Sequence, residues 1–210
     1  MQKPLSGKNI VLGVTGAVAA YKSVYLLRLL VKAGASVQVI GTQNSLNFIG
    51  RATWESLSGK VPLFDTFETK DPSHIGHIML AQDVDAIVVA PATANIIAKT
   101  ACGIADDLLS TVLCAATVPV LFAPGMNTAM YENPANLNNI KTVSGRNGFH
   151  FIEPGTGELA CGTSGKGRMA EPGDILKKLT DILIPASNGI RWLVTGGATR
   201  EYLDPVRFIT

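Results

Sequence analysis

The sequence of 210 residues carries little charge. Asp, Glu, Lys and Arg make up 16% of it, and the formal net charge is +2. A nucleic-acid-binding protein usually has a strongly basic stripe, so we expect no nucleic-acid partner. Acidic residues are missing altogether before Glu55, whereas six Lys and Arg residues precede it. This stretch suits an anionic ligand, although a solvated basic face would give the same pattern.

Cysteine and long apolar runs are also scarce. Cys102, Cys114 and Cys161 have neither CxxC spacing nor a metal-ligand pattern, so we expect free thiols, no metal and a cytoplasmic location. We place Cys102 and Cys114 in the core, because they lie in or beside predicted helices. Residues 1–8 lack the apolar region of a signal peptide. Runs such as Ala86–Ala92 are too short to cross a bilayer, so no membrane partner is expected.

Short β-rich runs alternate with amphipathic stretches along the chain. We expect strands at Asn9–Val14, Ser36–Gly41, 85–90, 118–123 and 149–152, and helices at 17–33, 44–49, 53–58, 93–101, 106–116 and 174–184. Gly34 and Gly59 stand where two helices should end, and Pro134 marks the first turn of another. The pattern predicts an α/β fold with a doubly wound parallel sheet, a flavodoxin- or Rossmann-like three-layer sandwich.

Two segments break this alternation. Residues 154–172 are rich in glycine and lack periodicity, so we expect a loop that closes as a lid. Residues 185–189 read as a linker after a first domain at 1–184. A further strand is expected at 190–195, and the sequence stops before a second βαβ unit is complete. We therefore interpret 190–210 as the truncated start of a second domain.

A glycine-containing turn, Gly13 to Gly16, joins the first strand to the first helix. It would bring a phosphate to the free amides of the helix N-terminus, although a plain turn gives the same spacing. The second strand ends in Thr42, Gln43 and Asn44. A NAD site would place a carboxylate there for the ribose, so NAD is disfavoured. Neutral donors suit the phosphate and polyol chain of a mononucleotide, and FMN is the leading candidate.

Chemically active side chains follow or precede the predicted strands. His77 lies between apolar neighbours, and its imidazole could take a proton near neutral pH. The third and fourth strands are each followed by a Pro and then an Asn, namely Asn95 and Asn127. Helix capping by Thr93 and Asn127 would explain either motif alone; two together indicate a binding rim. Cys161 could donate a proton if its loop closes.

The ordered motifs resemble those of the flavin-containing cysteine decarboxylases, most closely the phosphopantothenoylcysteine decarboxylases of coenzyme A biosynthesis. They are Gly16-Ala17-Val18-Ala19-Ala20-Tyr21-Lys22, Gly76-His77-Ile78, Pro91-Ala92-Thr93-Ala94-Asn95, Pro124-Gly125-Met126-Asn127, Ala160-Cys161-Gly162 and Gly167-Arg168-Met169. The resemblance covers nearly the whole chain. Gly125 stands where Ala is usual and Thr93 where Ser is frequent, and neither departure removes a functional group.

The resemblance implies FMN-dependent decarboxylation of 4'-phosphopantothenoylcysteine, in which oxidation of the cysteine moiety creates the electron sink that CO2 loss needs. His77 would be the base, Asn127 would hold the carboxylate and Cys161 would donate the final proton. The positions matching the FMN site are Gly16, Ala17, Val18, Thr42, Gln43, Asn44, Thr93, Ala94, Asn95 and Gly125. Those for the substrate are Asn127, Met126, Lys166 and Arg168. The family assembles as homotrimers, sometimes packed into larger particles such as a dodecamer.

Residues 194–201 and 203–207 resemble the opening of the family's partner half, a CTP-dependent phosphopantothenate–cysteine ligase. Three alternatives stay open. A flavin prenyltransferase shares the fold but should not need the set of His77, Asn127 and Cys161. A peptidyl-cysteine decarboxylase would lack the ligase start. A non-catalytic regulatory subunit would be expected to lose Cys161 or its loop.

Overall fold

The computed structural model describes residues 3–66, 68, 76–158, 164–184, 201–202 and 208–209. Its elements are, in order, β1 (Asn9–Val14), α1 (Ala20–Lys32), β2 (Ser36–Gly41), the 3-10 helix η1 (Gln43–Asn47), α2 (Arg51–Ser58), α3 (Gly76–Gln82), β3 (Ala86–Ala92), α4 (Ala94–Cys102), α5 (Leu108–Ala115), β4 (Val120–Pro124), α6 (Thr128–Tyr131), α7 (Pro134–Ser144), β5 (Phe149–Phe151), β6 (Gly155–Glu158), β7 (Ser164–Arg168), α8 (Pro172–Leu183), β8 (Glu201–Tyr202) and β9 (Phe208–Ile209).

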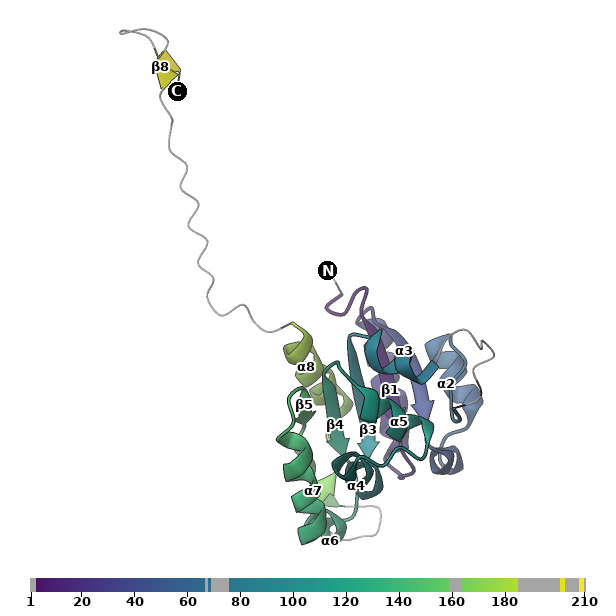
Figure 1. Ribbon diagram of the computed structural model, residues 1–210. Coiled ribbons are helices and arrows are strands. Elements are labelled where there is room, and N and C mark those ends of the chain that lie inside the picture. Colours follow the sequence, from purple (N-terminus) through teal and green to yellow (C-terminus); the bar gives the residue numbers. More distant parts are fainter. Residues whose placement is uncertain are drawn as a thin grey trace.

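The core is a five-stranded parallel sheet with the strand order β2-β1-β3-β4-β5. This is the flavodoxin-like doubly wound order, which confirms the predicted fold class. Every residue of β3 is buried, because helices cover both faces of the central strands. Figure 1 shows the strands running in one direction between two helical layers.

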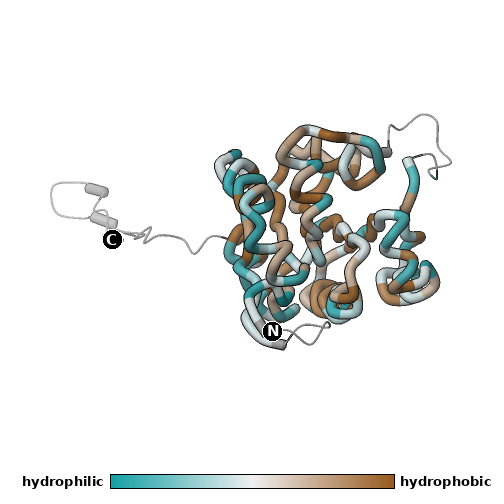
Figure 2. The backbone as a smooth tube through the Cα atoms, turned by 90° about the horizontal axis from the view of Figure 1, so that it is seen from below, coloured by the Kyte–Doolittle hydropathy of each residue, from teal (hydrophilic) through white to brown (hydrophobic). Residues whose placement is uncertain are grey.

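Alternate residues of each strand face different helices, since successive side chains in a strand point to opposite faces. Leu12 and Val88 belong to one buried cluster, which includes side chains of α1, α2 and α8. Val11 and Ile87 belong to the other, which includes side chains of α3, α4, α5 and α7. Hydrophobic and hydrophilic residues alternate along the outer helices, as expected of helices that bury one side (Figure 2).

Some expectations need correction. The segment 154–172 is not simply a loop, because β6 and β7 pair as an antiparallel hairpin within it. Helix α1 begins at Ala20 rather than at residue 17, since a turn occupies the residues before it. Cys102 and Cys114 are exposed rather than in the core. Each lies near the end of its helix, where the chain turns towards solvent.

The expected strand at 190–195 and the linker at 185–189 lie outside the described residues. Beyond them the structure describes β8 and β9, which pair with each other in antiparallel register. Within the described ranges, none of the helices combines the length and apolar character needed to cross a membrane.

Candidate active site

The carboxyl ends of β1 and β3 lie side by side and form the switch point of the sheet. The chain leaves β1 towards β2 on one side, and leaves β3 towards β4 on the other. Ligands of doubly wound sheets bind in the crevice beyond such a point. The turn at Gly16, the start of α4 at Thr93 and the turn at Gly125 all follow strands that end at this edge.

The N-termini of α1 and α4 lie at this edge and have no side-chain cap. Ala19 precedes α1 and Thr93 precedes α4, and the described residues place no capping side chain on the first amides of either helix. By contrast, Asp107 forms a capping box with Ser110 at the start of α5. At α1 the N–H groups of Ala20 and Lys22 already donate to the carbonyls of Ala17 and Ala19 at 2.9 Å, so these amides are occupied. The positive ends of both helix dipoles nevertheless face this edge and favour an anionic group. The arrangement therefore fits a phosphate between the first and third strands.

The turn after β1 touches the segment after β2. A Cβ atom on Gly16 would lie 2.6 Å from the Asn44 Cβ, so only glycine permits this close approach. The backbone N–H of Thr42 donates to the Val14 carbonyl at 2.9 Å. The Thr42 hydroxyl is buried and has no hydrogen-bond partner in the described part of the chain. Such an unsatisfied group fits a site whose ligand supplies the partner, as the polyol and phosphate of FMN would.

The turn after β4 connects the sheet edge to the hairpin. Gly125 donates its N–H to the Ala92 carbonyl at 3.1 Å, and Met126 donates to the Gly167 carbonyl at 3.0 Å. The Asn127 side chain accepts from the N–H of Ala129 at 2.8 Å and so caps the short helix α6. Capping therefore explains part of the role of Asn127. The same cap fixes its side chain at the start of α6, beside the hairpin.

Strand β7 packs closely against this turn. A Cβ on Gly165 would fall 2.4 Å from the Thr128 hydroxyl oxygen, and one on Gly167, whose φ is +140°, would fall 2.4 Å from the Met126 carbonyl oxygen. Both positions require glycine, since the strand touches the turn directly. Glu158 and Ser164 are register partners at the far end of the hairpin. The connection that contains Cys161 therefore joins two strands, of which β7 is fixed to the Met126–Asn127 turn.

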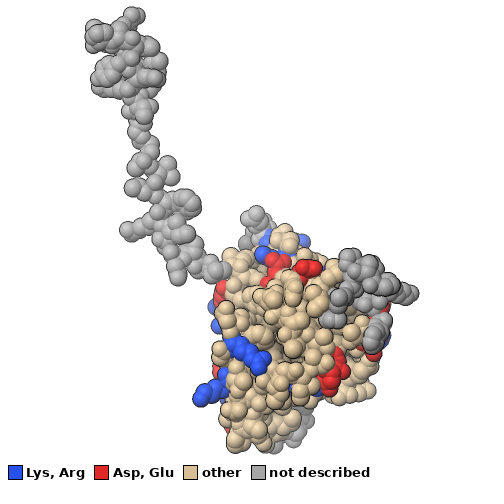
Figure 3. Space-filling view, in the orientation of Figure 1, with Lys and Arg blue, Asp and Glu red and all other residues tan. Residues whose placement is uncertain are grey.

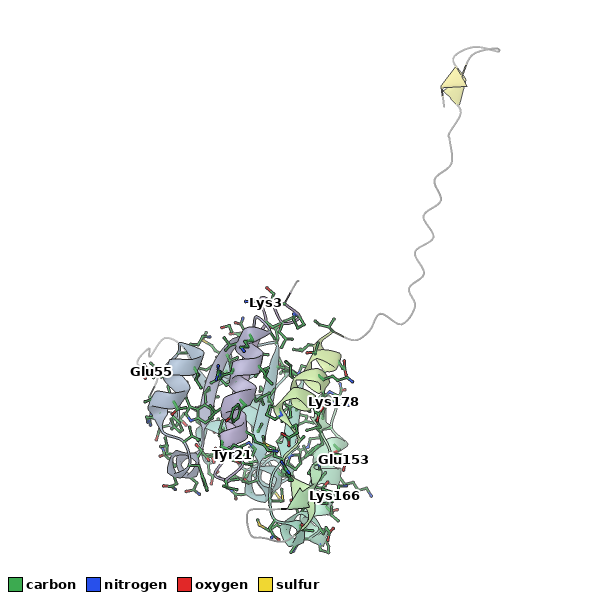
Figure 4. All side chains as sticks on the ribbon, turned by 180° about the vertical axis from the view of Figure 1, so that it is seen from behind. Lys3, Tyr21, Glu55, Glu153, Lys166 and Lys178 are labelled. Carbon is green, nitrogen blue, oxygen red and sulfur yellow. The ribbon has the colours of Figure 1, made fainter. Side chains whose placement is uncertain are left out.

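Lys166 and Arg168, expected at the substrate, lie on β7 with carboxylate partners. The ammonium of Lys166 lies 2.6 Å from Glu153 and 5.4 Å from the centre of the Tyr131 ring. Its hydrogen bond to Glu153 raises the pKa of Lys166. Arg168 contacts Glu171 at 3.3 Å and lines a cavity of about 400 Å³ with it. Figure 4 shows Lys166 and Glu153 together near the hairpin.

Lys22 is a site residue whose role the sequence did not reveal. Its side chain is buried, and its ammonium donates to the Met169 carbonyl at 2.9 Å and to Glu171 at 2.8 Å. The hydrogen bond from Lys22 lowers the pKa of Glu171. Lys22 thus holds the base of the hairpin against α1. A lysine on the apolar side of an amphipathic helix is the signal that could have found it.

The two remaining catalytic candidates are not brought to this edge by the described residues. Cys161 lies outside them. His77 belongs to α3, and the structure does not describe its side chain. Met79, further along α3, lines a cavity with Asn9 and Ser36, the first residues of β1 and β2. This part of α3 therefore lies at the opposite edge of the sheet, beside the amino ends of the strands (Figure 1).

Comparison with curated proteins gives close relatives. The Coenzyme A biosynthesis bifunctional protein CoaBC of Bacillus subtilis is 46% identical over 210 residues, which cover 98% of this chain and 52% of the relative. The protein of the same name from Haemophilus influenzae is 41% identical over 208 residues, with the same coverage of 98% and 52%. The chain thus spans about half the length of the curated relatives it matches.

Solved structures show the same architecture. A mutant PPC decarboxylase complexed with pantothenoylaminoethenethiol has a TM-score of 0.74 and 31% identity, covering 82% of this chain and 96% of that one. The FMN-dependent cysteine decarboxylase SpaF has a TM-score of 0.73 and 27% identity, covering 86% and 97%. A family model described as Flavoprotein matches residues 1–184. The chain therefore belongs to the flavoprotein family, as its motifs indicated.

Proposed function

We propose that the chain binds FMN and decarboxylates 4'-phosphopantothenoylcysteine to 4'-phosphopantetheine in coenzyme A biosynthesis. The observation that carries the proposal is the meeting of the N-termini of α1 and α4 at the switch point, beside the buried hydroxyl of Thr42, which has no hydrogen-bond partner among the described residues. The first acidic residue of the chain, Glu55, comes after these turns in the first two βα units. The likeness to CoaBC proteins and to a PPC decarboxylase supports the substrate.

The FMN site is made by the turns after β1, β2, β3 and β4. FMN supplies an electron acceptor that the substrate carboxylate itself lacks. The residues that hold it are Gly16, Ala17, Val18, Thr42, Gln43, Asn44, Thr93, Ala94, Asn95 and Gly125. The amides at the start of α4 and the positive end of the α1 dipole bind the phosphate, and the Thr42 hydroxyl donates to the polyol or the phosphate.

Each remaining site residue has one role towards the substrate. Asn127 and Met126 position the carboxylate beside the hairpin. His77 takes the proton of the substrate thiol. Cys161 returns a proton after CO2 has left. Lys166 and Arg168 attract the anionic substrate to the mouth of the site.

The chain acts as a homotrimer or a larger homo-oligomer such as a dodecamer, in which a neighbouring subunit completes the site. Within one chain, the part of α3 beyond His77 lies at the edge opposite Asn127, so a base from another subunit would resolve the separation. Two surfaces support such contacts, one apolar and one low in charge, and a closed ring needs two complementary patches per subunit. Val18, Tyr21 and Tyr25 are 55%, 50% and 59% exposed.

The second surface lies on the other helical layer. The face over α3 and α5 is largely free of charged side chains (Figure 3), and Figure 4 shows Tyr21 on the opposite side of the sheet. Replacement of Tyr25 by Glu should dissociate the assembly and abolish turnover, which light scattering and an activity assay would measure. A Tyr25→Glu variant that keeps the parental mass and rate would contradict this assignment.

The wider setting follows from the same relatives. The protein works in the cytoplasm, where the pathway's soluble substrate is available. Residues 1–184 form the decarboxylase domain, 185–189 the linker, and 190–210 the start of a phosphopantothenate–cysteine ligase domain. The bifunctional name of the CoaBC proteins supports a ligase in the whole protein.

The test of the proposed function has two parts. Chain reconstituted with FMN and freed of excess flavin should keep the flavin absorption bands. Incubation with 4'-phosphopantothenoylcysteine should then give a product lighter by one CO2, detected by mass spectrometry. A chain that binds NAD but not FMN, or that leaves the substrate unchanged when loaded with FMN, would refute the proposal.

A further inference from the structure

The third strand has an irregular end directly before the proposed FMN site. Its ladder with β1 ends at Val89, and its register with β4 shifts between Val89 and Ala92. The carbonyl groups of Ala90 and Pro91 therefore fall outside both regular ladders. A buried carbonyl needs a partner, because an unpaired one loses its hydrogen bond to water without replacement.

Two buried hydroxyl groups supply these partners. Ser23 of α1 donates its Oγ–H to the Ala90 carbonyl at 2.6 Å, and Thr15, directly after β1, donates to the Pro91 carbonyl at 2.7 Å. Thr15 also accepts from the N–H of Thr93 at 3.3 Å. Thr15 is 1% exposed and Ser23 is 0% exposed. One βα unit thus holds consecutive carbonyls of the neighbouring strand.

These bonds connect the N-termini of α1 and α4. Thr15 is adjacent to Gly16 in the turn before α1, and Thr93 is the N-cap of α4. Neither Thr15 nor Ser23 belongs to the set that contacts FMN in the proposed function. Their contacts are to backbone carbonyls of the neighbouring turn, so they act on FMN through the positions of Thr93 and the first amides of α4.

We propose that Thr15 and Ser23 are positioning residues that hold the turn after β3 in register with the turn after β1, and so pre-form the FMN phosphate site. The proposal rests on the proposed function, since it takes FMN as the ligand. Without either hydroxyl, the turn after β3 relaxes to satisfy its carbonyl, and FMN binding must restore the original arrangement. The free energy of that restoration appears as lost affinity.

Thr15→Val removes the hydroxyl and keeps the shape of the side chain, and Thr15→Ser keeps the hydroxyl. Thr100→Val is the matched control, because the buried Thr100 hydroxyl donates to the Ile96 carbonyl within α4, away from these turns. Flavin fluorescence titration gives the FMN dissociation constant, visible circular dichroism reports the environment of bound FMN, and thermal unfolding of the FMN-free chain reports stability.

We expect Thr15→Val to weaken FMN binding by about tenfold or more, about 1.4 kcal/mol or more, and to change the visible circular dichroism. Ser23→Ala, which removes one oxygen atom and should fold even if Thr15→Val does not, should weaken it by about threefold or more. Thr15→Ser should restore parental binding, and Thr100→Val should lower stability without affecting affinity.

Parental affinity and dichroism in Thr15→Val or in Ser23→Ala would overturn the proposal. So would a Thr100→Val variant that weakens FMN binding as much as Thr15→Val, because any lost buried hydroxyl would then suffice. If the parental chain itself fails to bind FMN, the proposed function fails and the positioning role with it. If the parent, Thr15→Val and Ser23→Ala all bind FMN with the same affinity, only the positioning role is refuted.

Discussion

The contact between Gly16 and Asn44 gives a sharp steric test of the FMN site. A Cβ on Gly16 would lie 2.6 Å from the Asn44 Cβ and 3.1 Å from its carbonyl carbon and oxygen. Gly16 does not have a positive φ, so alanine meets no backbone penalty there and the effect is purely steric. Because the Asn44 atoms are close to or part of the backbone, η1 itself has to move.

Overpacking of this kind costs about 1–3 kcal/mol, and here the cost falls on the contact between two turns of the site. We therefore expect Gly16→Ala to weaken FMN binding by about tenfold or more, since about 1.4 kcal/mol corresponds to tenfold. Gly145→Ala is the matched control, because Gly145 follows α7 and lies outside the FMN set. Its Cβ would lie 3.5 Å from the Lys141 carbonyl oxygen and 3.6 Å from that of Thr142, which are ordinary contacts.

The assay is a flavin fluorescence titration of both variants, with urea unfolding of the FMN-free proteins alongside it. We expect Gly145→Ala to bind FMN as the parent does. Equal affinities for Gly16→Ala and Gly145→Ala would refute the argument that the turn after β1 and the segment after β2 meet around FMN. A Gly16→Ala variant that loses stability but keeps its affinity would do the same.

Three further predictions concern the chemistry and the stability of the chain. Cys161→Ser should still release CO2 but accumulate the unsaturated enethiol product, whereas His77→Asn should block the first step. Mass analysis and flavin absorbance would separate the two outcomes. Normal turnover by Cys161→Ser would contradict its role as proton donor. The Lys22 hydrogen bond lowers the pKa of Glu171, so its contribution to stability is present above the unfolded pKa of about 4.3 and is lost as pH falls through the lowered folded pKa. Lys22→Met should reduce that acid-side dependence in thermal unfolding, and only the weaker contact with Arg168 should then lower the pKa of Glu171. Asp107→Ala removes the cap of α5 and should lower the free energy of unfolding by about 1 kcal/mol. Urea unfolding would measure this change, and an unchanged urea midpoint would contradict the prediction.

Local signals in the sequence were sufficient for most of the sheet. The strands Asn9–Val14 and Ser36–Gly41 occur with the predicted bounds, because apolar runs between turn residues are characteristic of buried parallel strands. Gly34 and Gly59 end their helices with φ values of +97° and +70°, as the glycine signal indicated. The strand order then follows from the alternation and the rules of parallel connections.

The hairpin could not be predicted in the same way. Gly165 and Gly167 have no side chains to show a strand period, and β7 forms because it packs against Thr128 and Met126, which are distant in sequence. Cys102 and Cys114 were placed wrongly in the core, since position in a helix does not settle which side of its last turns faces solvent.

The sequence predicted those parts of the candidate site that directly follow the ends of strands. The turns at Gly16, Asn44, Thr93 and Gly125 meet at one edge because parallel strands end there together. The buried partners of these turns, such as Thr15, were not visible in the sequence, because their hydrogen bonds join residues of different βα units. The roles of the catalytic residues stay predictions.

The most direct test of the central claim is a single turnover of the FMN-loaded chain with 4'-phosphopantothenoylcysteine under anaerobic conditions. Flavin absorbance would be followed by stopped flow and the product by mass spectrometry at the same times. The account predicts that the oxidised flavin band decreases as CO2 is lost and then returns as 4'-phosphopantetheine appears, since the net reaction is redox-neutral. Decarboxylation with no change in the flavin band, or a bleached flavin that never recovers, would contradict it.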